Sequence, residues 1–134
     1  MESQAEQLKA RTKRFAIRIV RVFRSLPKTD EARIIGKQLL RAGTSVAANY
    51  RAVCRSRSKA EFISRMSVVV EEADETVFWL ELLTETSIIA EARLSELLGE
   101  TNELLAICAA SLRTAKVRRT HAATSQEPNA LTTQ

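Results

Sequence analysis

Apolar residues recur along most of this chain at alternating steps of four and three. That spacing places them on one stripe of a helix, as in helices that pack against a partner helix. The longest such stretch, residues 58–83, has a wide apolar face whose two flanks require at least two neighbouring helices. Ser58, with Glu61 three residues later, predicts a capping box at its start. We expect this helix to be the backbone of the fold.

Three further stretches with the same spacing predict the other helices. The first covers residues 4–25 and ends before Pro27, because proline cannot continue the hydrogen-bond ladder. The others cover residues 30 to about 55 and about 90 to 117. Four helices joined by short links predict an all-α fold, an antiparallel up-down-up-down four-helix bundle.

Composition agrees with a helical bundle, and it indicates where the bundle ends along the chain. The chain has only three Gly and two Pro, a composition typical of all-helical proteins. We expect residues 1–117 to form the bundle and residues 118–134, which are polar and lack periodicity, to be a disordered tail. No apolar run of membrane-spanning length occurs, and charges stand where a secretory signal needs an apolar segment. We therefore expect a cytoplasmic protein with no membrane partner.

We call the apolar stripe of each helix its seam. Small and polar residues on or beside the seams predict how the second and third helices pair. The RSRS link, residues 55–58, would close an antiparallel hairpin between these helices. Gly43 then falls opposite the third helix and lets it approach closely. Arg41 lies near Glu72 and Glu75. Asn49 is the one amide on that seam, where it serves either register and a local network or a ligand. Arg41, Asn49, Glu72 and Glu75 form the expected structural polar network.

The side chains that catalysis requires are missing or badly placed. Carboxylates cluster over residues 71–75, but a di-metal site in a bundle also needs Glu-x-x-His pairs, and the one histidine is His121 in the predicted tail. No serine or cysteine has a histidine partner in the expected bundle, and no glycine-rich phosphate loop occurs. Cys54 and Cys108 are expected to be small buried residues. We predict a protein that is not an enzyme, with no catalytic residue, cofactor or metal.

Charge is unevenly distributed along the chain, whose net charge is +5. Residues 1–65 hold 16 Lys and Arg against 5 Asp and Glu, whereas residues 66–134 hold 5 against 11. Such a division is compatible with binding a polyanion and equally with the two halves pairing with each other.

Basic residues give the candidate nucleic-acid site. A stripe borders the apolar face of the first helix, and a second group surrounds the RSRS link; together they are Arg11, Arg14, Arg18, Arg21, Lys28, Arg51, Arg55, Arg57 and Lys59. Each cation that neutralises a phosphate of RNA or DNA adds salt-dependent affinity. Aromatic residues do not interleave with them, so the contact would be to backbone or shape. The alternative is a solvated face, or pairing with acidic helices in a protein-binding scaffold without a nucleic-acid role.

Phe78 gives the candidate oligomer interface. It falls on the polar side of its helix, in a row with Glu71, Asp74 and Glu81. An outward aromatic residue ringed by carboxylates is typical of an interface anchor with a charged rim. The basic first helix of a second copy is a complementary surface, and unlike surfaces that pair in this way close into a ring when the rotation permits. We therefore expect a homo-oligomer.

The segment from residue 44 to residue 83 resembles the family known as four helix bundle proteins, which is related to proteins encoded in intervening sequences of bacterial large-subunit ribosomal RNA genes. The similarity extends over residues 11–116. The matching residues are Ser45, Ala48, Asn49, Tyr50, Arg51, Arg57, Ser58, Lys59, Phe62, Glu72, Ala73, Glu75, Thr76, Trp79, Leu80 and Leu83. Ala52 departs from the family pattern, which often has Glu after Asn-Tyr-Arg.

The resemblance implies an antiparallel bundle that assembles as a ring, commonly a homopentamer. Accessory proteins of diversity-generating retroelements are similar at a greater distance, and they bind nucleic acid and a reverse transcriptase through a basic surface of the ring. By this resemblance the expected partners are further copies of the chain, RNA or DNA, and a protein such as a reverse transcriptase.

Overall fold

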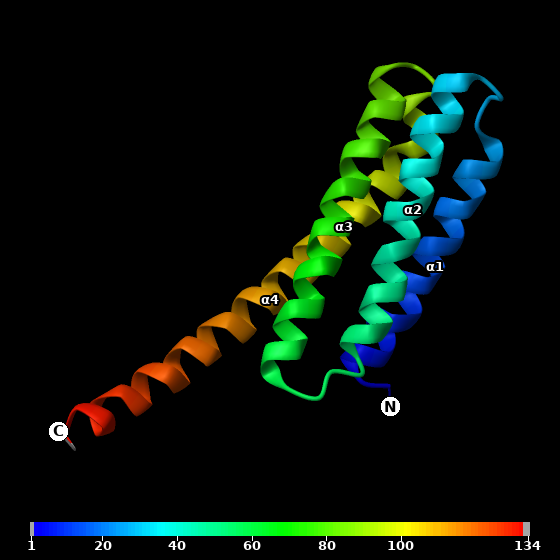
Figure 1. The fold of residues 1–134 in the computed structure, drawn as a ribbon. Coiled ribbons are helices and arrows are strands. Elements are labelled where there is room, and N and C mark those ends of the chain that lie inside the picture. The colour runs from blue at the N-terminus through cyan, green and yellow to red at the C-terminus, as the bar shows by residue number, and fades with distance from the viewer. Residues whose placement is uncertain (1, 133–134) are drawn as a thin grey trace.

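The structure, a computed structural model, describes residues 2–132, with side chains described through residue 120. All regular structure in residues 2–132 is helical, which confirms the all-α fold. The elements are α1 (Gln4–Ser25), α2 (Asp30–Val53), α3 (Lys59–Glu85) and α4 (Glu91–Thr132) (Figure 1). The bounds of α1 are those predicted, and α2 ends two residues before Arg55. Within this part of the chain, no helix is both long and apolar enough to cross a bilayer.

Local hydrogen bonds explain where the helices begin. The side chains of Ser3, Thr29 and Ser58 accept from the backbone N–H three residues later, as N-caps do. The Ser58 bond to the N–H of Glu61 measures 3.1 Å. The Glu61 carboxylate pairs instead with Arg65, one turn further along, at 2.6 Å. The predicted start of α3 is therefore confirmed, and it rests on the serine cap.

The turn between α3 and α4 is a Schellman motif. Ser87 has a positive φ of 59°, and the N–H of Ile88 donates to the carbonyl of Leu83 at 3.0 Å. Ile89 then packs into the core with 3% of its surface exposed. This turn reverses the chain without a glycine.

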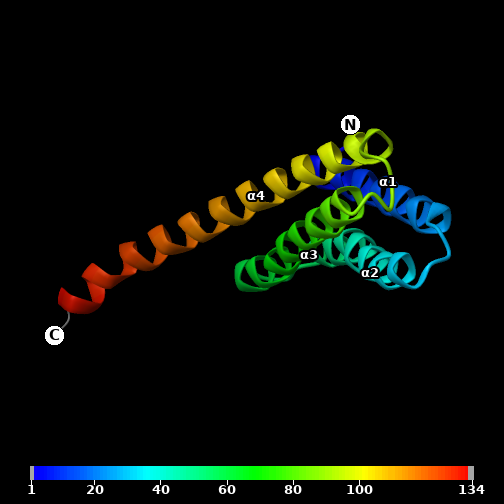
Figure 2. The ribbon, with the colours of Figure 1, turned by 90° about the horizontal axis from the view of Figure 1, so that it is seen from above.

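The four helices are arranged as an antiparallel bundle in chain order. α2 packs against α1 and α3, α3 also packs against α4, and α1 meets α4 over a much smaller area. α1 and α3 therefore occupy opposite corners of the bundle. Figure 2 shows α4 continuing beyond the other three helices. Ala115 is the last buried residue among those described.

The core follows the predicted seams in α1, α2 and α3. The residues that are nearly fully buried include Phe15, Leu39, Val46, Met66 and Leu80. Truncating a buried leucine to alanine costs about 2–5 kcal/mol through lost transfer free energy and the cavity left behind. In α4, Leu94, Leu97 and Leu104 are buried. Helical spacing from Leu94 also predicts Leu98 and Leu105 on the buried stripe, but these two are half-buried. The bundle core is thus built from residues on all four helices.

The glycines of α2 face α1, which corrects the prediction for Gly43. A Cβ at Gly43 would lie 2.7 Å from Cγ1 of Ile19, and one at Gly36 would lie 2.5 Å from Cδ1 of Leu26. Both side chains belong to the segment before α2. Gly43 therefore brings α2 close to α1, and its expected role in the approach of α3 is wrong.

Two predictions about single segments differ from the structure. Cys108 is buried as expected, but Cys54 is exposed at the end of α2. α4 is helical to Thr132, beyond the predicted limit at residue 117. The predicted tail residues from 121 onward, including His121, lie outside the residues whose side chains are described.

Candidate nucleic-acid and subunit interfaces

The basic stripe, defined as Arg11, Arg14, Arg18 and Arg21, lies along the flank of α1 that faces α4. Arg11 is engaged within the protein. Its guanidinium donates through Nε and Nη2 to both carboxylate oxygens of Glu100, at 2.9 and 2.6 Å, and Nη2 lies 3.0 Å from Glu103. The alternative of pairing with an acidic helix therefore holds for this arginine.

The ion pair has the expected electrostatic effects. Hydrogen bonding from Arg11 holds the pKa of the Glu100 carboxyl below its usual value, and the nearby charges of Arg14 and Arg18 act in the same direction. Hydrogen bonding to Glu100 in turn raises the pKa of Arg11. This pair links α1 to α4 where the two helices otherwise make little contact.

The rest of the basic stripe remains available. Arg14 and Arg21 are exposed and Arg18 is half-buried. None of the three forms an ion pair with another described residue. A neighbouring polyanion would therefore meet at least two free guanidinium groups on this flank.

The remaining predicted cations lie elsewhere. Arg51, Arg55 and Arg57 are exposed at the end of the bundle formed by the α2–α3 link, where they border a concavity of about 500 Å³ together with Arg65. Arg65 is held in place, since it pairs with Glu61 and donates to the carbonyl oxygen of Ala52 at 2.7 Å. We name Arg51, Arg55 and Arg57 the end cluster.

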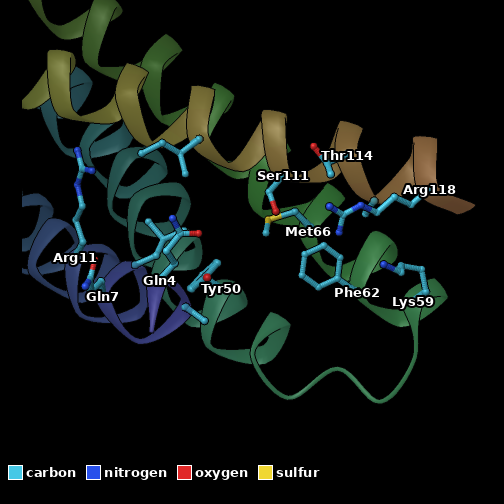
Figure 3. A pocket seen from close by; sticks show the side chains of 14 residues that line it. Gln4, Gln7, Arg11, Tyr50, Lys59, Phe62, Met66, Ser111, Thr114 and Arg118 are labelled. Atoms are coloured by element: carbon cyan, nitrogen blue, oxygen red, sulfur yellow. The ribbon is translucent and has the colours of Figure 1, made fainter. Parts of the chain in front are cut away.

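Lys59 and Lys28 belong to neither group. Lys59 lies beside Phe62 at the mouth of a groove between α1 and α4, across from Arg118 (Figure 3). Lys28 lies in the α1–α2 link, at the other end of the bundle. The structure therefore does not bring the nine predicted cations together on a single surface, because the basic stripe faces α4 whereas the end cluster lies between α2 and α3.

The groove in Figure 3 is a cavity of about 710 Å³ that opens where α4 diverges from α1. Tyr50, Phe62 and Met66 are among its apolar lining residues, and burial raises the pKa of the Tyr50 hydroxyl. Its lining contains no carboxylate and no histidine. No group of His, Cys, Asp and Glu in the described residues is arranged to hold a metal ion.

The candidate oligomer interface points into solvent, as predicted. We define the acidic row as Glu71, Asp74, Phe78, Glu81 and Glu85; all five residues are exposed, and Phe78 retains 53% of its surface. The Phe78 ring packs edge-to-face on Trp79, with centroids 4.8 Å apart and an interplanar angle of 73°. Trp79 thus contacts the Phe78 ring on the outer face of α3, and about half of the residue stays exposed.

The predicted polar network forms in part. Arg41 pairs with Glu72 at 3.3 Å and with Glu75, and the Trp79 indole also donates to Glu75, at 3.1 Å. The predicted register of α2 and α3 is therefore confirmed. Asn49 does not belong to this network, because its amide donates to the Ser45 carbonyl within α2 at 2.8 Å. Tyr50, the next residue, takes the buried position.

A second basic pocket lies at the α1–α2 turn, and sequence reasoning missed it. This turn pocket has a volume of about 510 Å³ and is lined by Phe23, Arg24, Leu26, Pro27, Lys28, Ala32, Arg33 and Lys37. Of its four cations, only Lys28 was among the predicted site residues. The others stand on two different helices. The signal would have been the four cations on the two helix ends that meet at one turn, although Asp30 and Glu31 stand among them in the sequence.

Two comparisons with known proteins show which family the chain belongs to and which solved structure it resembles. The family model of the 23S rRNA-intervening sequence protein matches residues 6–110. The chain belongs to that family. The crystal structure of a protein of unknown function from the S23 ribosomal protein family of Bacteroides thetaiotaomicron is similar, with 30% identity and a TM-score of 0.76. The match covers 83% of this chain and 99% of that one. Among curated proteins, none matches this chain.

Membership of the 23S rRNA-intervening sequence protein family agrees with the resemblance drawn from the sequence. The matched range contains α1 from its third residue onward, all of α2 and α3, and α4 up to residue 110. The family match therefore includes the basic stripe, the end cluster, the turn pocket and the acidic row.

Proposed function

We propose that this member of the family is a non-catalytic interaction protein that assembles into a ring and binds the backbone of RNA or DNA through its basic stripe. One observation carries the proposal. α1 holds seven Lys and Arg against one Glu, and α3 holds two against seven Asp and Glu. Because α1 and α3 stand at opposite corners, most of these charges do not neutralise one another within one chain. They remain available to other molecules.

The nucleic-acid part of the proposal rests on Arg14, Arg18 and Arg21. These cations follow one another at helical spacing on one flank of α1 and lack an ion-pair partner among the described residues. Such a row suits a chain of phosphates, to which guanidinium groups bind bidentately. The family name of 23S rRNA-intervening sequence protein agrees with an RNA context without naming a ligand.

The first prediction tests this binding. Replacing Arg14, Arg18 and Arg21 together by Ala is expected to weaken binding of a fluorescent RNA oligonucleotide at low salt, about 50 mM. The slope of log affinity against log salt should fall by roughly 2–3, since about three phosphate contacts are removed. Fluorescence anisotropy over a salt series measures both quantities.

A matched control changes the same amount of charge elsewhere. Arg93, Arg113 and Lys116 are exposed on α4 and form no ion pair with a described residue. Replacing these three by Ala should leave the salt slope nearly unchanged. Undetectable binding by the unaltered chain at low salt, or equal losses in the two variants, would contradict the nucleic-acid role.

The assembly part of the proposal rests on Phe78. Its half-exposed ring contacts Trp79 and is bordered by carboxylates, as is typical of an interface anchor. Such an anchor fits a partner surface that is apolar and basic. The second prediction is a solution mass well above the 15.0 kDa of one chain. The resemblance to ring-forming proteins sets the expected value at five copies, about 75 kDa. Light scattering at micromolar concentration that gave one chain mass would contradict it.

The alternative function is a protein-binding scaffold in which α1 serves subunit contacts alone. The engagement of Arg11 by Glu100 and Glu103 favours it, since part of the basic stripe already acts within the protein. Under this alternative, the Arg14, Arg18 and Arg21 variant loses mass in light scattering, whereas nucleic-acid affinity is absent from the start. A pull-down with a reverse transcriptase tests the protein partner that the resemblance implies.

A further inference from the structure

The turn pocket, at the α1–α2 link, combines an apolar floor with a basic rim. Phe23, Leu26, Pro27 and Ala32 form the floor. Gly36 makes this floor possible, because a Cβ there would lie 2.5 Å from Cδ1 of Leu26 and 3.2 Å from Cδ1 of Phe23. The two side chains can therefore spread over the surface of α2.

The rim of the turn pocket is positively charged throughout. Arg24, Lys28, Arg33 and Lys37 are all exposed, and none forms an ion pair with another described residue. No carboxylate lines the pocket. Beside the rim, Ile34 exposes 65% of its surface, the largest exposed fraction of any large hydrophobic residue in the described part of the chain. The pocket thus fits an apolar group that brings negative charges with it.

The acidic row of α3 has that complementary pattern. Its centre is the exposed Phe78 ring, and its other four members are carboxylates. The numbers match, with four free cations around an apolar floor on one side and four carboxylates around an aromatic anchor on the other. Pairing the two buries an aromatic ring, the kind of group that supplies most of the binding energy at interfaces.

The two surfaces also lie at the same height along the bundle. Arg41 pairs with Glu75, which fixes the register of the antiparallel helices α2 and α3. One turn from this pair toward the α1–α2 end of the bundle, Lys37 on α2 comes level with Phe78 on α3. A closed ring relates its subunits by a rotation, which preserves height along the ring axis. A donor and an acceptor at one level are therefore what a ring with its axis along the bundle requires.

We propose that the turn pocket receives Phe78 and the carboxylates of the acidic row from a second copy of this chain. The contact joins two unlike surfaces, the turn pocket of one copy and the acidic row of another. It cannot form within one chain, because α1 and α3 stand at opposite corners of the bundle. It rests on the proposed assembly and names the partner surface of the acidic row. It leaves Arg14, Arg18 and Arg21 free for nucleic acid.

Two single-surface variants test the pairing. Phe78→Asp breaks the donor, and Arg33→Glu with Lys37→Glu breaks the acceptor. Each should be a folded monomer near 15 kDa, because the altered residues are exposed. Mixed in equal amounts, the two variants should form a dimer of about 30 kDa and nothing larger, since one intact donor meets one intact acceptor. Sedimentation velocity measures the masses, and circular dichroism verifies that each variant is helical.

Matched controls separate this pairing from general effects. Val117→Asp alters a residue as exposed as Phe78, at 54%, and Arg51→Glu with Arg55→Glu reverses two charges in the end cluster. Both controls should keep the mass of the unaltered chain. If the unaltered chain assembles but the Arg33 and Lys37 variant keeps its mass, or the mixture stays monomeric or forms full rings, the pairing is overturned and the assembly stands. A monomeric unaltered chain would overturn both.

Discussion

Two arginines on the same flank of one helix can have different partners in this bundle. Arg11 and Arg14 are three residues apart on the same flank, yet Arg11 is engaged by Glu100 whereas Arg14 is exposed without an ion pair to any described residue. The sequence contained both arginines and the carboxylates of α4, but their pairing depends on how the two helices cross. Charge alone therefore could not distinguish a structural arginine from one available to a ligand.

The pair between Arg11 and Glu100 predicts a pH-dependent stability. Because the folded pKa of Glu100 is lowered, its contribution is present above the ordinary carboxyl pKa, about 4.3, and is lost as the pH falls through the folded value. Glu100→Gln should lower the free energy of unfolding by about 1 kcal/mol at neutral pH and by much less near pH 3. Urea unfolding at the two pH values measures the difference.

Glu96→Gln is the matched control for this prediction. Glu96 lies one turn earlier on α4, is exposed, and forms no ion pair with a described residue. It should change stability little at either pH. An equal loss at both pH values for Glu100→Gln would show that packing, not the ion pair, is responsible.

At the scale of the helix, periodicity predicted the seams well but could not choose between adjacent apolar residues. In α4 the pairs Leu97 with Leu98 and Leu104 with Leu105 each offer two candidates. The structure buries Leu97 and Leu104, which share a flank with Glu100 and so lie on the side of α4 nearer α1. The choice is made by the position of a helix far away in the sequence.

Glycines give a prediction at this scale. Gly43→Ala should destabilise the bundle by about 1–3 kcal/mol, because the new Cβ would lie 2.7 and 2.8 Å from two carbons of Ile19. Gly99→Ala, on the exposed surface of α4 with nothing within 4 Å, should stabilise it by up to about 1 kcal/mol through helix propensity. Thermal unfolding of the two variants measures the opposite signs. Stabilisation by both changes would contradict the close approach of α2 to α1.

For the whole molecule, the arrangement of the helices determines what the charge division means. A basic first half and an acidic second half are compatible with internal neutralisation, but α1 and α3 stand at opposite corners. The molecule therefore has a basic corner and an acidic corner, a distribution that favours head-to-tail association between copies.

This distribution predicts salt-sensitive assembly. Raising the salt concentration from about 50 mM to about 500 mM shortens the Debye length from roughly 14 to 4 Å and should weaken the proposed contact between the two corners. The midpoint of the transition from oligomer to monomer should move to higher protein concentration. Sedimentation velocity over a dilution series measures it, and a midpoint that does not move would indicate a contact dominated by apolar burial.

The sequence by itself determined the four helices apart from the length of α4, the Ser58 cap of α3 and the register of α2 with α3, because these depend on neighbouring residues or on one short link. It also placed Phe78 and its carboxylates on an exposed face, since helical spacing alone separates that face from the buried seam. Only the tertiary structure decided that the nine predicted cations are divided among separate surfaces, that Gly43 faces α1, and that Arg24, Arg33 and Lys37 surround one pocket. These features depend on the angles and distances between helices distant in sequence, which no local pattern encodes.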